Sequence, residues 1–186
     1  MILNTKELYH KKENNLSSNR NNKTSLLVTT ALLTALVFIC TILLRIPVGP
    51  DCYIHLGDAV IILSVLLLPI PYACFAGSIG ASLADLIGGF AFWAPWTYVI
   101  KLLTVLVLGI FIDKQKKNAS DKTFLGISTY EFFGLCIAGL VSVVGYFISE
   151  LILFGNVVPA AACVPFNIIQ VVIGAIIAEL IYHRIK

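Results

Sequence analysis

Charge is scarce in this chain of 186 residues: 12% of the residues are charged, while 59% are hydrophobic. Beyond the N-terminal tail and one loop, there is too little polar sequence to cover the surface of a soluble globule. The apolar stretches also lack the alternation of polar and apolar residues that a membrane β-barrel shows. These two absences predict an all-α integral membrane protein.

Motifs for nucleotide hydrolysis, metal binding and serine catalysis are missing as well. The sequence has no Gly-x-x-x-x-Gly-Lys-Ser/Thr phosphate loop. Its five cysteines show neither a CxxC pair nor a Cys/His ligand spacing, so we expect no structural disulfide and no metal site. Gly80-Ala-Ser82 fits an intramembrane serine nucleophile, but none of the three histidines is placed to act as its base. We therefore expect no enzyme, no catalytic residue and no cofactor in this chain.

Six apolar stretches follow one another along the sequence. A transmembrane helix needs about 20 apolar residues, and the second stretch is so short that it must be extended by loop residues or cross part of the bilayer. The predicted spans are Thr24–Leu44, Gly57–Leu68, Tyr72–Phe90, Thr97–Ile112, Tyr130–Phe154 and Val158–Tyr182. Residues 1–23 are polar and of low complexity, and we expect a disordered tail there, followed by a six-helix domain over residues 24–186.

The positions of lysine and arginine predict the orientation of these helices. Of the 13 cationic residues, five precede the first span, four lie between the fourth and fifth spans, and two follow the sixth. Six crossings put all of these on one face, which the positive-inside rule makes cytoplasmic. Both termini are therefore predicted to be cytoplasmic. The net charge of +3 follows from this bias and gives no indication of nucleic-acid binding.

Ionisable residues within the spans gather near the opposite, outer face. A charge in hydrocarbon costs roughly 2.5–3.5 kcal/mol on insertion scales, so such residues are usually functional or paired. The residues concerned are Asp58, Asp85, Lys101 and Glu150. Lys101 is too deep to remain unpaired, and we expect Asp85 or Glu150 to be its partner. The pattern predicts a small-molecule pocket that opens outward.

Polar residues of the last two spans extend this pocket. Tyr146 and Glu150 are four residues apart and Asn167 and Gln170 three apart, so each pair shares one helix face. The amide pair fits structural hydrogen bonding between helices, but a polar cavity shared with Glu150 accounts for more of the pattern.

Two outer loops are placed to cover the pocket. The first loop carries His55, which lies beside Asp58. Asp58 itself equally fits an ordinary acidic residue in the first turn of a helix. Trp93 belongs to an aromatic segment whose default interpretation is a membrane-interface belt, but its ring is also suited to stacking on a planar heterocycle. The predicted substrate-binding residues are Glu150, Asn167, Gln170, Tyr146, Lys101, Asp85, Trp93 and His55.

The first span contains two alanines, Ala31 and Ala35, on one face. Small residues at this spacing let another helix approach closely, because lipid gives helices no hydrophobic drive to associate. Packing inside the bundle would explain the pair equally well. We interpret this face as a docking surface for a partner protein.

These segments together resemble the substrate-binding S components of energy-coupling factor (ECF) transporters, which import vitamins into prokaryotes. The resemblance extends from Ala31 to the C-terminus, and is closest to the branch with pyridoxine/hydroxymethylpyrimidine-type and riboflavin-type S components. The matching segments are Ala31-x-x-x-Ala35, Ile54-His-Leu-Gly-Asp-Ala-Val60, Gly77-Ser-Ile-Gly-Ala-Ser-Leu-Ala-Asp-Leu86, Trp93-Ala-Pro95 with Ile100-Lys101, Gly145-Tyr146 with Glu150, and Pro165-x-Asn167-x-x-Gln170.

The resemblance implies a multi-pass subunit in the cell membrane of a prokaryote that captures a vitamin on the extracellular side. It also implies a T component docked on the Ala31/Ala35 face, and two partner ATPase subunits that use ATP to drive import. A neutral ring compound with hydroxymethyl or amino substituents, such as pyridoxine or hydroxymethylpyrimidine, suits the polar pocket best, with riboflavin next. The alternative is a stand-alone proton-coupled secondary transporter, which usually shows an internal repeat that this sequence lacks. A membrane enzyme is the third and weakest hypothesis.

Overall fold

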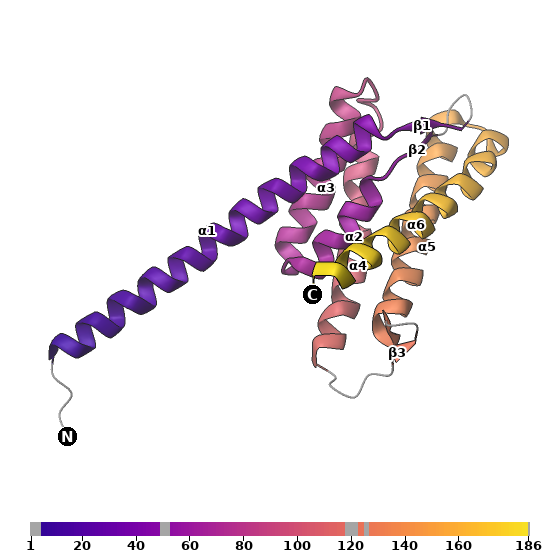
Figure 1. The fold of residues 1–186 in the computed structure, drawn as a ribbon. Helices are drawn as coiled ribbons and strands as arrows, with labels where there is room; N and C mark the ends of the chain where they lie inside the picture. Colours follow the sequence, from indigo (N-terminus) through magenta and orange to yellow (C-terminus); the bar gives the residue numbers. More distant parts are fainter. Residues whose placement is uncertain (1–4, 49–52, 118–122, 125–126, 186) are drawn as a thin grey trace.

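The computed structural model describes residues 5–48, 53–117, 123–124 and 127–185. Within this part of the chain, six helices form a bundle with two short hairpins (Figure 1). The helices are α1 (Thr5–Leu43), α2 (Gly57–Leu67), α3 (Ile70–Ile87), α4 (Ala94–Lys117), α5 (Thr129–Phe154) and α6 (Val157–Ile185). The antiparallel strand pairs are β1 (Ile46–Pro47) with β2 (Tyr53–Ile54), and β3 (Thr123–Phe124) with β4 (Ile127–Ser128).

The short helix α2 lies at the centre of the bundle. Its 11 residues extend about 16 Å, roughly half of the hydrocarbon core, which is about 30 Å thick. Every residue from Gly57 to Leu66 is buried, and α1, α3, α4 and α6 all pack against it. The structure thus confirms that the second apolar segment is too short to cross the membrane alone.

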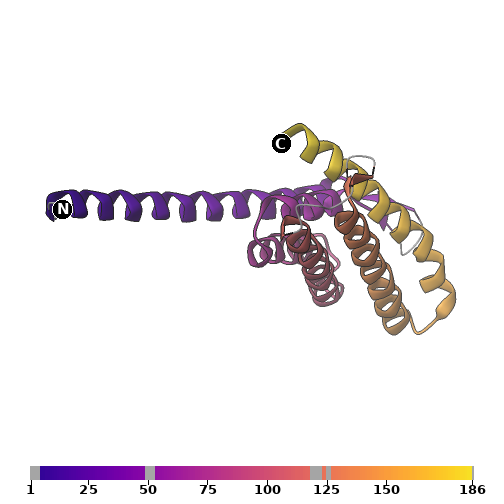
Figure 2. The ribbon, with the colours of Figure 1, turned by 90° about the horizontal axis from the view of Figure 1, so that it is seen from below.

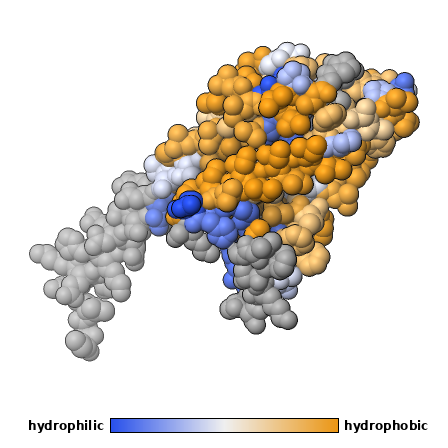
Figure 3. All heavy atoms as spheres, turned by 45° about the vertical axis from the view of Figure 1, so that its right-hand side comes forward, coloured by the Kyte–Doolittle hydropathy of each residue, from blue (hydrophilic) through white to orange (hydrophobic). Residues whose placement is uncertain are grey.

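The other five helices are each long and apolar enough to span a bilayer. Apolar side chains cover most of the surface seen in Figure 3, and large ones such as Leu32, Leu140 and Leu180 are exposed. In water this surface would be strongly unfavourable, whereas in lipid it needs no partner. The helix boundaries agree with the predicted spans to within a few residues, except at the N-terminal end of α1 and at the C-terminal end of α4.

The first helix begins at Thr5 and so includes most of residues 1–23, for which the sequence predicted disorder. Its N-terminal part projects away from the bundle (Figures 1 and 2). Propagation of an existing helix adds one hydrogen bond for each residue fixed, without the cost of nucleation. A polar segment can therefore continue the membrane-spanning part of α1 as a helix without packing against other elements.

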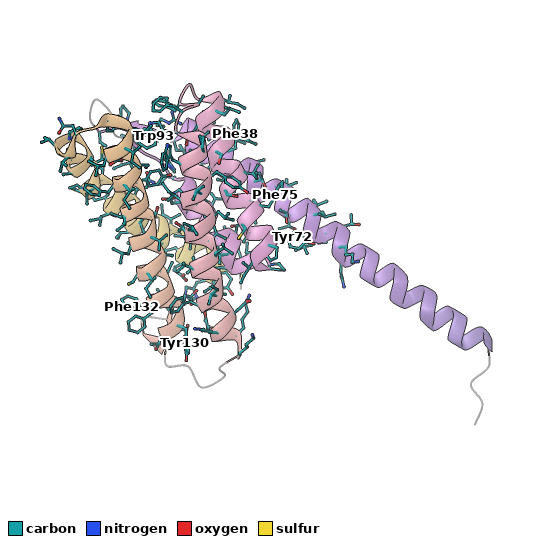
Figure 4. All side chains as sticks on the ribbon, turned by 180° about the vertical axis from the view of Figure 1, so that it is seen from behind. Phe38, Tyr72, Phe75, Trp93, Tyr130 and Phe132 are labelled. Carbon is teal, nitrogen blue, oxygen red and sulfur yellow. The ribbon has the colours of Figure 1, made fainter. Side chains whose placement is uncertain are left out.

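Four connecting segments lie together at one end of the bundle. The β1–β2 hairpin, the first turn of α2, the start of α4 and the α5–α6 turn all lie at what we call the β1–β2 end. Figure 4 shows Trp93 at this end, with Tyr130 and Phe132 at the opposite, β3–β4 end. Gly155 adopts a left-handed conformation (φ 62°), which ends α5 and lets α6 return directly beside it.

Candidate substrate-binding site

A small cavity lies at the β1–β2 end, among the loop before α2, the segment before α4, and helices α5 and α6. Its volume of about 40 Å³ holds about three water molecules, so a vitamin-sized molecule requires the wall to open. The lining side chains are those of Tyr53, His55, Trp93, Tyr146, Glu150, Cys163, Asn167 and Gln170. The structure thus brings together six of the eight residues predicted for the pocket.

A buried ion pair next to the cavity connects α2, α4 and α6. The Lys101 ammonium lies 2.6 Å from Asp58 Oδ1, and the Lys101 side chain is 1% exposed. Gln170 Nε2 donates to Asp58 Oδ2 at 2.9 Å, while Gln170 Oε1 accepts from the His55 backbone N–H at 3.0 Å. Lys101 also donates to Ser142 Oγ at 3.4 Å. The Gln170 amide therefore has a fixed orientation, with both ends engaged by the protein.

The partner of Lys101 differs from the prediction, which named Asp85 or Glu150. The first-turn carboxylate of α2 takes that place, because α2 lies centrally and packs directly against α4. Asp85 and Glu150 have hydrogen-bond partners of their own. Among the described residues, neither Lys101 nor Asp85 lines the cavity itself.

His55 is a neutral side chain with a defined tautomer. Its Nδ1 accepts from the Gly57 N–H at 3.1 Å, so the proton of the neutral ring lies on Nε2. Burial lowers the pKa of His55 to about 4, against the opposing effect of the Asp58 carboxylate, and Lys101 and Arg45 lower it further. The Gln170 amide nitrogen, 3.5 Å from His55 Nε2, is itself a donor and cannot accept this proton. Since His55 lines the cavity, its Nε2–H can donate to a molecule there.

A second network holds the β1–β2 hairpin against the end of α3 and the start of α4. Asp85 accepts from Thr97 Oγ1 at 2.5 Å and from Tyr53 OH at 3.1 Å. The Arg45 guanidinium lies 4.3 Å from the ring centre of Tyr53 and 4.6 Å from that of Phe90, and 3.9 Å from Asp85. Burial and the Asp85 carboxylate raise the pKa of Tyr53, so this phenol remains a hydrogen-bond donor. Asp85 therefore positions Tyr53 in the cavity wall.

The α5 and α6 side of the cavity is polar, with an aromatic cover. Asn167 Nδ2 donates to Glu150 Oε1 at 3.3 Å, whereas Glu150 Oε2 is buried and has no hydrogen-bond partner among the described residues. The Trp93 ring lies 6.5 Å from that of Tyr146 and 6.0 Å from that of Phe154. The wall thus offers an unused carboxylate oxygen beside a group of packed aromatic rings.

Two lining residues, Tyr53 and Cys163, were missed from the sequence. Alternate residues of an extended segment share a side, so Tyr53 lies on the same side as His55. Cys163, Asn167 and Gln170 follow the i, i+4, i+7 spacing of one helix face. Both signals were present in the sequence.

Cys163 is also disulfide-bonded, so the expectation of no structural disulfide is wrong. A single cysteine pair leaves no spacing signature by which such a bond can be recognised in one sequence. The other described cysteines, Cys40, Cys74 and Cys136, are free.

Comparisons with known proteins give a family model that matches most of the chain and a similar curated protein. The family model described as "ECF-type riboflavin transporter, S component" matches residues 21–186. A protein of Pyrococcus woesei, named "Uncharacterized protein in gap 3'region", is 33% identical over 153 residues, which cover 81% of this chain and 94% of the relative.

A solved structure supports the same fold. It is described as "Structure and mechanism of the S component of a bacterial ECF transporter", and it matches with a TM-score of 0.70 at 19% identity. The match covers 88% of this chain and 96% of that chain. The predicted all-α membrane architecture with six helices is thereby confirmed.

Proposed function

Because the chain belongs to the family of ECF-type riboflavin transporter S components, we propose that its cavity captures a small water-soluble vitamin at the extracellular side for import. Membership of this family makes the chain a multi-pass membrane subunit that binds substrate, and not an enzyme. We place both termini in the cytoplasm of a prokaryote, since six crossings put the lysines and arginines of the N-terminal segment, of α4's last turn and of the C-terminal segment on one face.

One observation carries the proposal: polar groups from three elements converge on a single cavity with an aromatic cover. Glu150 and Asn167 come from neighbouring helices, and His55 comes from the loop before α2. Their unused donor and acceptor positions exclude an apolar ligand, because a buried polar group without a partner costs about 1–3 kcal/mol. Lys101 and Asp85 lie outside the lining and hold it in place, Lys101 through Asp58 and Asp85 through Tyr53.

We propose a pyridoxine- or hydroxymethylpyrimidine-like ring as the ligand. The small volume of the cavity, about 40 Å³, favours the smaller vitamins because they need the least displacement of the wall. Riboflavin is the second candidate, and the description of the matching family favours it. It would require a larger rearrangement of the hairpin and of the segment that carries Trp93.

Isothermal titration calorimetry on the purified subunit, against a panel of vitamins, tests the proposed site. We expect Asn167→Leu to weaken binding of the preferred vitamin by at least 10-fold, because the substitution removes a donor and an acceptor from the wall and leaves Glu150 without its partner. Val172→Leu, on the exposed side of the same helix, is the control and should bind as wild type does. Equal affinity in Asn167→Leu and wild type would place the site elsewhere.

The energy source gives a second test. The chain has no phosphate loop, so vesicles that contain it alone should bind the vitamin without accumulating it. Uptake should appear when a T component, two ATPase subunits and ATP are added. Accumulation by the lone subunit under a proton gradient would instead support the secondary-transporter alternative.

A further inference from the structure

The charged side chains around the cavity do not balance. In the described part of the chain, the β1–β2 half of the bundle holds two cationic side chains, Arg45 and Lys101, and three carboxylates, Asp58, Asp85 and Glu150. The ammonium of Lys101 is bound to Asp58 at 2.6 Å. The guanidinium of Arg45 faces Asp85 at 3.9 Å and lies against the rings of Tyr53 and Phe90. Within these described residues, the carboxylate of Glu150 is left without a cation.

Glu150 is also the carboxylate that faces the cavity. The residue is 6% exposed, and its Oε1 accepts one hydrogen bond from Asn167. Its Oε2 is buried and has no partner in the part of the chain that the structure describes. A buried carboxylate with no counter-charge is strongly unfavourable. A ligand that brings a positive charge to Oε2 would therefore gain far more here than it would in water.

The rest of the wall suits a cationic ring. Trp93 lines the cavity together with Glu150, and the faces of aromatic rings attract cations. His55 is different in character, because its Nε2–H is a donor and repels a second positive charge. The cavity thus has an anionic side at Glu150 and a hydrogen-bond donor at His55.

We propose that the ligand is a heterocycle with a protonated nitrogen, as an ammonium, an amidinium or a protonated ring, that pairs with Glu150. A hydroxyl or ring acceptor on the same molecule takes the hydrogen bond of His55. This inference rests on the proposed function, because it names the class of vitamin within the same cavity. It distinguishes cationic vitamins from neutral ones such as riboflavin.

Two forms of vitamin B6 provide a matched pair of probes. Pyridoxamine and pyridoxine share one ring, and differ in a protonated aminomethyl group in place of a hydroxymethyl group. Calorimetry at pH 7 on the full chain, with thiamin and riboflavin added to the panel, should show pyridoxamine binding at least 10-fold more tightly than pyridoxine. Glu150→Gln keeps the size of the side chain and removes its charge, so it should abolish this preference.

Glu179→Gln is the control, because it removes an equally buried carboxylate at the β3–β4 end and should leave the preference intact. Thermal unfolding of each variant verifies that it is folded. If Glu150→Gln does not fold, the preference of the wild type among the four vitamins decides whether the ligand is cationic. Tight binding of neutral vitamins only, or a preference unchanged in Glu150→Gln, would overturn the charge assignment and leave the proposed function standing. If no vitamin of the panel binds, the proposed function itself is overturned.

Discussion

Lys101→Met is expected to destabilise the protein by about 3–5 kcal/mol, because removing one partner of a buried ion pair leaves the other as an uncompensated charge. Asp58 would retain its hydrogen bond from Gln170 but would lose the ammonium that lies 2.6 Å away. The change should lower the apparent unfolding temperature of the detergent-purified subunit by roughly 6–20 °C. A fluorescence-detected melting curve measures the effect.

The double variant Lys101→Met with Asp58→Asn separates the charge from the packing. Removing both charges should recover most of the loss, since a neutral pair of similar volume often matches a buried ion pair in stability. The asparagine still offers an oxygen to Gln170. Lys114→Met, in the exposed last turn of the same helix, is the control and should change stability by about 0.5 kcal/mol or less. If Lys101→Met melts as wild type does, the buried pair contributes no stability.

The fold was largely predictable, because each helix is indicated by the residues of its own segment. Each long apolar stretch became a membrane helix, since the backbone in lipid has few other ways to satisfy its hydrogen bonds. The short second segment, Gly57–Leu67, was also identified from its length alone. Its central position was not predicted, because that depends on which helices pack against which.

The same distinction holds for the site. Residues that share one helix face, such as Glu150 with Tyr146 and Asn167 with Gln170, were grouped correctly from their spacing. The pairing of Lys101 with Asp58 was predicted wrongly, because it depends on contacts between three helices that lie far apart in the sequence. The Arg45 and Asp85 contacts with Tyr53 depend in the same way on where the hairpin folds back.

The second large effect is expected at Ala31 and Ala35, on a face of α1 that the bundle leaves open. Both alanines are exposed, whereas Val37 on the opposite side is fully buried. A Cβ on Gly80 of α3 would lie 2.8 Å from the Thr34 carbonyl oxygen, so α3 already occupies that other side closely. The Ala31/Ala35 face is thus available for another helix, and its small side chains permit close approach.

Replacing both alanines by tryptophan should abolish ATP-driven uptake in vesicles that contain the complete transporter, and should prevent copurification with a T component. Vitamin binding to the solitary subunit should change by less than 3-fold, because the cavity lies among the hairpin, α5 and α6, and its described lining includes no residue of α1. Ile176→Trp, on an exposed position of α6, is the control for adding a bulky ring to the membrane-facing surface, and should leave uptake intact. Normal assembly of the double variant with the T component would show that α1 docks through another face.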